Sequence, residues 1–153
     1  MRKLTTIVPA FIAAATLTLP LWAAAAPAKV ACNVDINYTV NGTPVDTYLK
    51  DFEVTRGETF FDDLSTAIRE KRFSASLARI DGKLMMSIDY NSDVSVFNQI
   101  LVDTSLQIRG VDVVVSTGGT HMFSSSQAVP SGNHRTTHAL ICHRLADEAP
   151  TTP

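Results

Sequence analysis

Charged side chains are scarce in this sequence of 153 residues: 18% are charged and 45% are hydrophobic. Soluble domains usually carry about 25% charged residues, and disordered chains are depleted of hydrophobic ones. The composition therefore excludes a disordered chain and a long coiled coil. Since a typical domain has about 100 to 200 residues, we expect a single folded domain.

An excess of positive charge is also missing, because 13 basic side chains stand against 15 acidic ones. Proteins that bind nucleic acid or an anionic membrane through their charge need a basic patch. We therefore expect no nucleic-acid partner, and the composition gives no reason to expect an anionic lipid surface as a partner.

The short motifs of common catalytic sites are absent as well. The sequence contains no G-x-S-x-G nucleophile turn, no H-E-x-x-H metal motif and no glycine-rich nucleotide loop. We expect a protein that is not an enzyme and that holds no cofactor.

Only two cysteines are present, Cys32 and Cys142, near opposite ends of the predicted domain. An even pair of cysteines in an exported chain predicts a disulfide. The alternative is a reactive thiol, but neither cysteine belongs to a C-x-x-C motif that would favour it.

The N-terminus has the three parts of a secretory signal peptide. Arg2 and Lys3 precede an apolar run over residues 4–22, and small residues follow up to Ala28. Cleavage after Ala25 or Ala28 would satisfy the small-residue rule. We assign residues 1–28 to a signal peptide, residues 29–145 to one β-rich domain, and residues 146–153 to a flexible tail.

The N-terminus has two alternatives to cleavage, a membrane anchor and a lipid attachment site. The apolar run approaches the length of a membrane span, but its alanine-rich end and the polar alternation that follows favour cleavage. Lys29, three residues before Cys32, does not fit a lipid attachment site. Removal of residues 1–28 takes away Arg2 and Lys3, so 11 basic and 15 acidic side chains remain and the net charge of the cleaved chain is −4. We expect a periplasmic or secreted protein with no remaining membrane anchor.

Strict alternation of apolar and polar residues over 32–40 predicts a half-buried strand. Asn41-Gly42 and Asp81-Gly82 are strong hairpin signals. Residues 45–54 continue in an extended pattern that changes parity near Leu49, which predicts a bulge there.

The spacing changes over 60–71, where apolar residues recur at helical intervals. Thr59 and Asp62 fit an N-terminal cap, and Arg69 and Lys71 fit the last turn of a helix. We therefore predict one α-helix near residues 60–71.

The remaining sequence predicts strands at 73–80, 83–90, 94–97, 100–108, 111–117, 120–123 and 136–144. Val113, Val114 and Val115 suggest a strand covered on both faces, and Gly118-Gly119 a turn. The fold prediction is mainly β: an antiparallel sandwich or small barrel of about eight short strands with one helix. Cys32 and Cys142 then require the first and last strands to be neighbours or to face each other.

The longest predicted loop, 124–133, is the predicted binding surface. Phe123 at its entry and Asn133, His134 and Arg135 at its exit offer apolar, aromatic and charged contacts.

Three functions compete on this pattern, and the third of them is an enzyme whose catalytic residues are scattered along the chain without a recognisable motif. The leading hypothesis is an exported, non-enzymatic module that binds another protein, such as an inhibitor, an immunity protein or an envelope-assembly accessory. The alternative is a small periplasmic copper- or zinc-binding protein that uses His121, Met122, His134 and His138. That alternative requires the strand from Thr120 to pair with the last strand.

Overall fold

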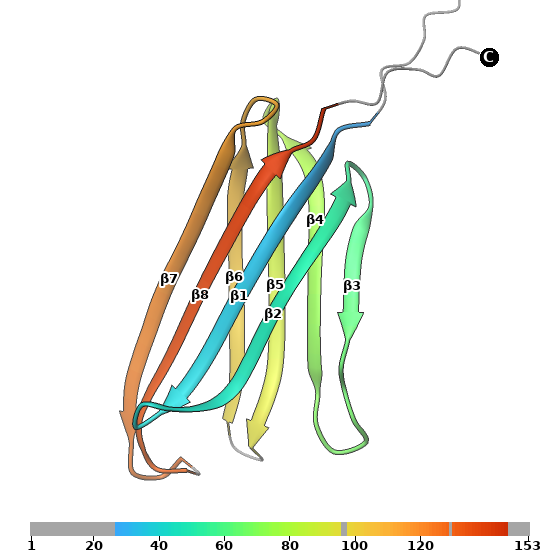
Figure 1. The fold of residues 1–153 in the computed structure, drawn as a ribbon. Helices are drawn as coiled ribbons and strands as arrows, with labels where there is room; N and C mark the ends of the chain where they lie inside the picture. Colours follow the sequence, from blue (N-terminus) through green and yellow to red (C-terminus); the bar gives the residue numbers. More distant parts are fainter. Residues whose placement is uncertain (1–26, 96–97, 129, 147–153) are drawn as a thin grey trace, which may run out of the picture.

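The computed structural model describes residues 27–95, 98–128 and 130–146. The predicted signal peptide, apart from its last two residues, and the tail from residue 147 lie outside this part. The described residues form eight strands (Figure 1), with these bounds: β1 Lys29–Val40, β2 Thr43–Thr55, β3 Thr59–Asp63, β4 Lys71–Ile80, β5 Lys83–Ser95, β6 Asn98–Ile108, β7 Val114–Ser125 and β8 Gly132–Arg144. In this described part there is no helix that could cross a membrane.

The strands form two antiparallel four-stranded sheets, which makes the fold an all-β sandwich. Sheet 1 has the order β2-β1-β8-β7, and sheet 2 has the order β3-β4-β5-β6. The chain passes from sheet 1 to sheet 2 between β2 and β3, and returns between β6 and β7. The last strand, β8, pairs with the first, β1.

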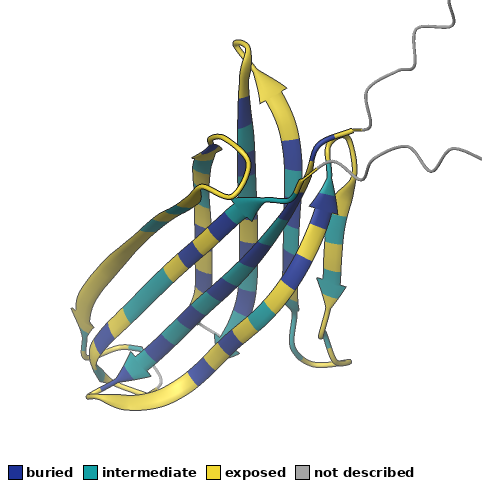
Figure 2. Ribbon diagram, turned by 45° about the horizontal axis from the view of Figure 1, so that its top comes forward, coloured by how far each residue is buried: buried dark blue, intermediate teal, exposed yellow. Residues whose placement is uncertain are grey.

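The alternation read from the sequence places the core between the two sheets. Every second residue of β1 is buried, from Val30 to Val40, because successive side chains of a strand point to opposite faces. β5 and β6 contribute Met86, Ile88 and Val102 from the other side. Figure 2 shows the result as buried bands that alternate with intermediate ones along β1 and with exposed ones along β2.

The disulfide between Cys32 and Cys142 is confirmed. The two residues lie directly opposite each other on β1 and β8, with their Cα atoms 4.1 Å apart. Both side chains are buried. The bond therefore joins the two central strands of sheet 1 near the start of β1 and the end of β8.

The predicted helix at 60–71 is wrong. Residues 59–63 form β3, which pairs with β4, and residues 64–70 form a turn. Phe60 faces inward against Phe52 at 5.1 Å between ring centroids, whereas Ile68 of the predicted apolar face is 96% exposed. Pairing with β4 and burial of one aromatic ring outweigh the weak local helical pattern.

The bulge is also misplaced in the sequence prediction. The register of β1 and β2 shifts where Tyr38 pairs with Asp46 and Thr39 with Pro44, so the extra residue is Val45. From Asp46 to Val54 the parity is regular, and Leu49 points outward with 70% exposure. The sequence suggested a bulge because Leu49 is apolar although it points outward, next to the inward-facing Tyr48.

Several strands are longer than the sequence suggested. The predicted strand at 94–97 is the end of β5, as far as it is described. Gly118-Gly119 is no turn: both glycines lie inside β7, a continuous strand of 12 residues. The start of β7 is not covered on both faces, because Val113 and Val114 are exposed.

Candidate functional site

A cleft opens between the two sheets on the side where β6 and β7 are edge strands. Figure 1 shows that these strands lie close together at their upper ends, whereas the lower end of β7 lies away from β6. The cleft has a volume of about 440 Å³. We call it the seam cleft. It is lined by Tyr38, Asn98, Gln99, Ile100, Leu101, Val102, Asp103, Gly119, Thr120, His121, Phe123, Thr136 and His138.

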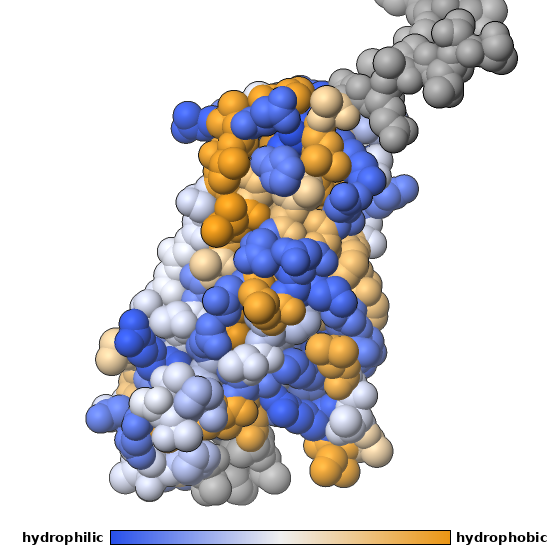
Figure 3. All heavy atoms as spheres, viewed as in Figure 1, coloured by the Kyte–Doolittle hydropathy of each residue, from blue (hydrophilic) through white to orange (hydrophobic). Residues whose placement is uncertain are grey.

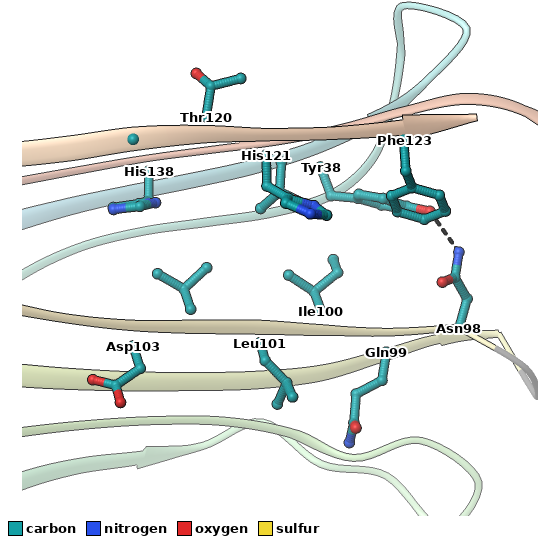
Figure 4. A pocket seen from close by; sticks show the side chains of 13 residues that line it. Tyr38, Asn98, Gln99, Ile100, Leu101, Asp103, Thr120, His121, Phe123 and His138 are labelled. Atoms are coloured by element: carbon teal, nitrogen blue, oxygen red, sulfur yellow. Dashed lines mark hydrogen bonds between the residues drawn. The ribbon is translucent and has the colours of Figure 1, made fainter. Parts of the chain in front are cut away.

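Sheet 1 supplies the aromatic wall of the seam cleft. Tyr38 on β1, Thr136 on β8 and His121 on β7 form one row of paired residues across the sheet. His138 pairs with Gly119 in one adjacent row. In Figure 4 the side chains of Tyr38, His121 and His138 point toward β6, whereas Thr120 points away.

Sheet 2 supplies the opposite wall through alternate residues of β6. Figure 4 shows Asn98 and Ile100 directed toward sheet 1, while Gln99, Leu101 and Asp103 point away. Ile100 and Val102 are buried, so the inner part of this wall is apolar, and Asn98 lies at one end of it, at the start of β6. The one acidic side chain among the lining residues is thus directed away from the cleft.

A hydrogen-bonded chain holds the aromatic wall at its lower end. The Asn98 amide donates to the Tyr38 hydroxyl oxygen at 2.7 Å, and that oxygen lies 2.5 Å from Nδ1 of His134. The Tyr38 hydroxyl thus joins Asn98 on β6 to His134 on β8. Burial raises the pKa of Tyr38 above its ordinary value, so the phenol keeps its proton.

Phe123 is fixed by stacking on this chain. Its ring is nearly parallel to that of His134, with an interplanar angle of 4° and centroids 4.4 Å apart. His134 is only 1% exposed, while Phe123 is 38% exposed. An exposed aromatic ring with a buried ring behind it forms a preformed contact surface.

The glycine pair in β7 makes room for β8. A Cβ at Gly119 would lie 2.8 Å from Cε1 of His138, and a Cβ at Gly118 would lie 2.6 Å from the His138 carbonyl oxygen. Any larger residue at position 119 would displace the His138 ring. Glycine therefore shapes the seam cleft at this point.

The β2 side of the sandwich contains a buried cluster of charged groups around Asp46. The Asp46 side chain is 4% exposed and forms ion pairs with Nη2 of Arg69 at 2.8 Å and Nζ of Lys71 at 2.9 Å. Tyr90 donates a hydrogen bond to the same carboxylate at 2.6 Å. Burial alone would raise the pKa of Asp46, but the bonds from Lys71, Tyr90 and Ser92 lower it below its ordinary value. This cluster anchors the turn at 64–70, because Arg69 belongs to that turn.

The structure separates the four residues of the predicted binding loop. Phe123 and His134 face inward and stack together, whereas Asn133 and Arg135 are exposed. Asn133 is held by Asn41, whose Oδ1 accepts its backbone N–H at 2.9 Å. The loop itself is shorter than predicted, since β7 extends to Ser125 and β8 begins at Gly132.

The histidines of the metal hypothesis lie partly together. β7 does pair with β8, as that hypothesis requires, and His121 and His138 both line the seam cleft. His134 is bonded to Tyr38, and Met122 lies between two inward-facing residues on the opposite face of β7. Among the residues that the structure describes, no group of three or more His, Cys, Asp or Glu side chains is placed to hold a metal ion.

Sequence reasoning did not identify Tyr38, Asn98 or Thr136 as site residues. The available signal was polarity at positions of inward parity: His134, Thr136 and His138 share a face with Leu140 and Cys142 of the core. Polar side chains on the core face of a strand require partners or an opening. In β8 they have both.

The outer face of sheet 1 is a weaker candidate. Figure 3 shows a mainly polar surface with apolar atoms gathered at its upper end. Val114 at the start of β7, and Val111 and Val113 just before it, are exposed. A few exposed apolar residues are normal on a soluble protein, so this patch needs no functional explanation.

Comparison with known proteins adds no family assignment. No protein-family description matches this chain, and no curated protein matches it in sequence.

Proposed function

We propose that this chain is an exported, non-enzymatic module that binds another protein, in the periplasm or outside the cell. The seam cleft is its recognition site, and it receives a side chain of the partner. The observation that carries this proposal is a preformed cleft of about 440 Å³, in which the exposed ring of Phe123 stacks on the buried ring of His134.

The size and lining of the seam cleft support an anchoring side chain. Ligand pockets have volumes of about 300 to 1,000 Å³, and protein interfaces concentrate their energy in aromatic or arginine anchors that fill such pockets. Ile100 and Val102 offer apolar contact, and His121 and His138 offer hydrogen-bonding nitrogens. An uncharged aromatic anchor with one polar atom, such as tyrosine or tryptophan, fits this combination.

Export is supported by two independent features. The sequence begins with a charged, apolar and small-residue pattern typical of signal peptides. The disulfide between Cys32 and Cys142 is the form that cysteines take in oxidising compartments.

The proposal is tested by using the purified protein to capture its partner from the native envelope. The same capture is then repeated with a variant whose new side chain fills the seam cleft. Thr136 lines the seam cleft, and Thr137, the next residue on β8, lies on the opposite face. We expect the wild-type protein and Thr137→Trp to capture the same partner, and Thr136→Trp to lose it by at least tenfold. Melting temperatures of the three proteins establish that each is folded.

Equal capture by wild type and Thr136→Trp would contradict the proposal. Loss with Thr137→Trp alone would move the recognition site to the outer face of sheet 1.

A further inference from the structure

Imidazole rings are concentrated at the seam cleft. Three of the four histidines of the chain, His121, His134 and His138, lie on the inward faces of β7 and β8, and His121 and His138 line the cleft itself. Histidine is the side chain that ordinarily changes its charge between pH 5 and pH 8. The seam cleft therefore carries two groups that take up protons in mild acid.

The groups that face His121 and His138 from the neighbouring strands are uncharged. β6 presents one amide and two apolar side chains, those of Asn98, Ile100 and Val102. β1 presents Tyr38, whose phenol keeps its proton because burial raises its pKa. On β8, the basic side chain of Arg135 lies on the opposite, exposed face.

The carboxylates of the surrounding strands are placed away from these rings. Asp103 of β6 points away from the cleft, and Asp35 of β1 lies on the outward face, between two buried residues. The inward-facing Asp46 belongs to β2, beyond β1, and is already paired with Arg69 and Lys71. β7 and β8 contain no acidic residue. A proton on either ring thus adds a charge that no carboxylate of these strands neutralises.

Filling the seam cleft changes the surroundings of both rings. In the free protein His121 is exposed and His138 is partly buried, so water solvates them in either charge state. An anchor in the cleft replaces that water with apolar surface, which penalises the charged form of a side chain much more than the neutral form. An uncharged anchor therefore binds best when both rings are neutral.

We infer that His121 and His138 make recognition pH-dependent: the seam cleft holds an uncharged anchor at neutral pH and releases it in mild acid, when these rings take up protons. This inference rests on the proposed function and names the residues that regulate its site. Because coupling between two binding events is reciprocal, the bound anchor must also oppose protonation of the two rings.

His134 has a different part in this site. It is buried in the free protein and bonded to Tyr38, so filling the cleft does not change its access to water. The pH dependence is therefore assigned to His121 and His138 alone.

Two small probes of nearly equal size test the inference on the mature protein, with affinities measured by NMR chemical-shift titration. N-acetyltryptophanamide is uncharged, whereas N-acetyltryptophan carries a carboxylate at both pH 7.5 and pH 5.5. Because an ordinary imidazole is mostly neutral at the first pH and mostly charged at the second, we expect the uncharged probe to bind about tenfold more weakly at pH 5.5. The anionic probe should bind no more weakly there. Equal affinity of the uncharged probe at both pH values, or equal weakening of the two probes, would overturn the inference.

Matched variants assign the effect to the two rings. The double variant His121→Gln/His138→Gln keeps hydrogen-bonding groups that do not take up protons, so we expect its affinity for the uncharged probe to be nearly the same at both pH values. His143→Gln is the control, because His143 lies on the opposite face of β8 from His138, and it should keep the wild-type pH dependence. Melting temperatures at both pH values establish that each protein is folded. A double variant that keeps the pH dependence would overturn the assignment.

The histidine ring signals of the wild-type protein provide a readout that needs no variant. Saturation with the uncharged probe should move the titration of His121 and His138 to lower pH and leave that of His143 unchanged. Titrations that do not respond to the probe would overturn the inference, even where the double variant no longer binds.

The same measurements separate this inference from the proposed function. Binding of the uncharged probe that does not depend on pH would leave the seam cleft as a recognition site and overturn only its regulation. Absence of binding at pH 7.5 would contradict the uncharged aromatic anchor of the proposed function, and this inference with it.

Discussion

At the scale of single residues, Tyr38 connects the core to the candidate site. Its ring is buried, while its hydroxyl bonds both Asn98 and His134. His134 in turn supports Phe123, the exposed ring of the cleft. The shape of the seam cleft at this end therefore depends on one buried hydroxyl group.

Replacing Tyr38 with Phe should lower the free energy of unfolding by about 1 to 3 kcal/mol, because a buried imidazole nitrogen loses its partner. Tyr48→Phe is the matched control: its hydroxyl bonds the Asp62 carboxylate, which is partly exposed and can bind water instead. Urea denaturation of both variants measures the difference. Equal losses would show that the bond between Tyr38 and His134 carries no special cost.

Asp46 predicts a specific sensitivity to acid. Its pKa is lower in the folded protein than its ordinary value of 3.8. The unfolded chain therefore binds the proton first, and the stability that Asp46 contributes above pH 4 is lost as the pH falls through the folded pKa.

We expect the free energy of unfolding to decrease between pH 5 and pH 2, and Asp46→Asn to reduce the part of that decrease due to this group. Denaturation at several pH values, with Asp51→Asn as an exposed control on the same strand, measures the effect. An unchanged pH profile in Asp46→Asn would contradict the assignment.

At the scale of elements, local signals succeeded where local geometry decides the structure. Asn41-Gly42 and Asp81-Gly82 form the predicted turns, and all four residues have positive φ. The alternation of β1 is correct at every position. Turn residues and period-two patterns determine backbone and facing directly, so the sequence alone is sufficient there.

The sequence predictions were wrong where contacts between residues far apart in the chain determine the local structure. The helical spacing at 60–71 was overridden by pairing with β4 and by packing of Phe60 against Phe52. Gly118-Gly119 read as a turn because glycine usually marks one. Here glycine is needed because β8 approaches closely, which no local pattern reports.

The two glycines of β7 should respond differently to alanine. Gly118→Ala places a methyl group against the backbone oxygen of His138, so we expect a loss of about 1 to 3 kcal/mol in unfolding free energy. Gly119→Ala meets only the tip of the His138 ring, which can rotate, and should be nearly neutral. Thermal denaturation compares them, and a larger cost at position 119 would contradict this account.

At the scale of the whole molecule, the disulfide closes the chain between its first and last strands. Cys32 and Cys142 enclose almost all of the described domain, with a sequence separation of 110. A link across a loop of this size restricts the unfolded chain strongly, although measured effects vary.

The double variant Cys32→Ala/Cys142→Ala should lower the free energy of unfolding by about 2 to 5 kcal/mol and retain the fold. Replacing both residues avoids a free thiol. Guanidinium denaturation gives the value, and wild-type protein treated with reductant provides the comparison. A loss below about 1 kcal/mol would show that strand pairing between β1 and β8 suffices by itself.

The seam cleft is formed by strands of both sheets, so the sequence alone predicts only part of it. Parity correctly gave His134 and His138 a common face, and β7 pairs with β8. The cleft itself depends on how the lower ends of β6 and β7 diverge between two sheets. That arrangement results from the packing of all eight strands, and the residues that line the cleft carry no sequence motif.

Methyl NMR with the partner recovered from the native envelope tests the central claim most directly. Ile100 and Val102 face the seam cleft, whereas Leu49 and Val114 are exposed on sheet 1. We predict that partner binding shifts the methyl signals of Ile100 and Val102 and leaves those of Leu49 and Val114 unchanged. Shifts confined to Leu49 and Val114 would contradict the assignment of the seam cleft as the recognition site.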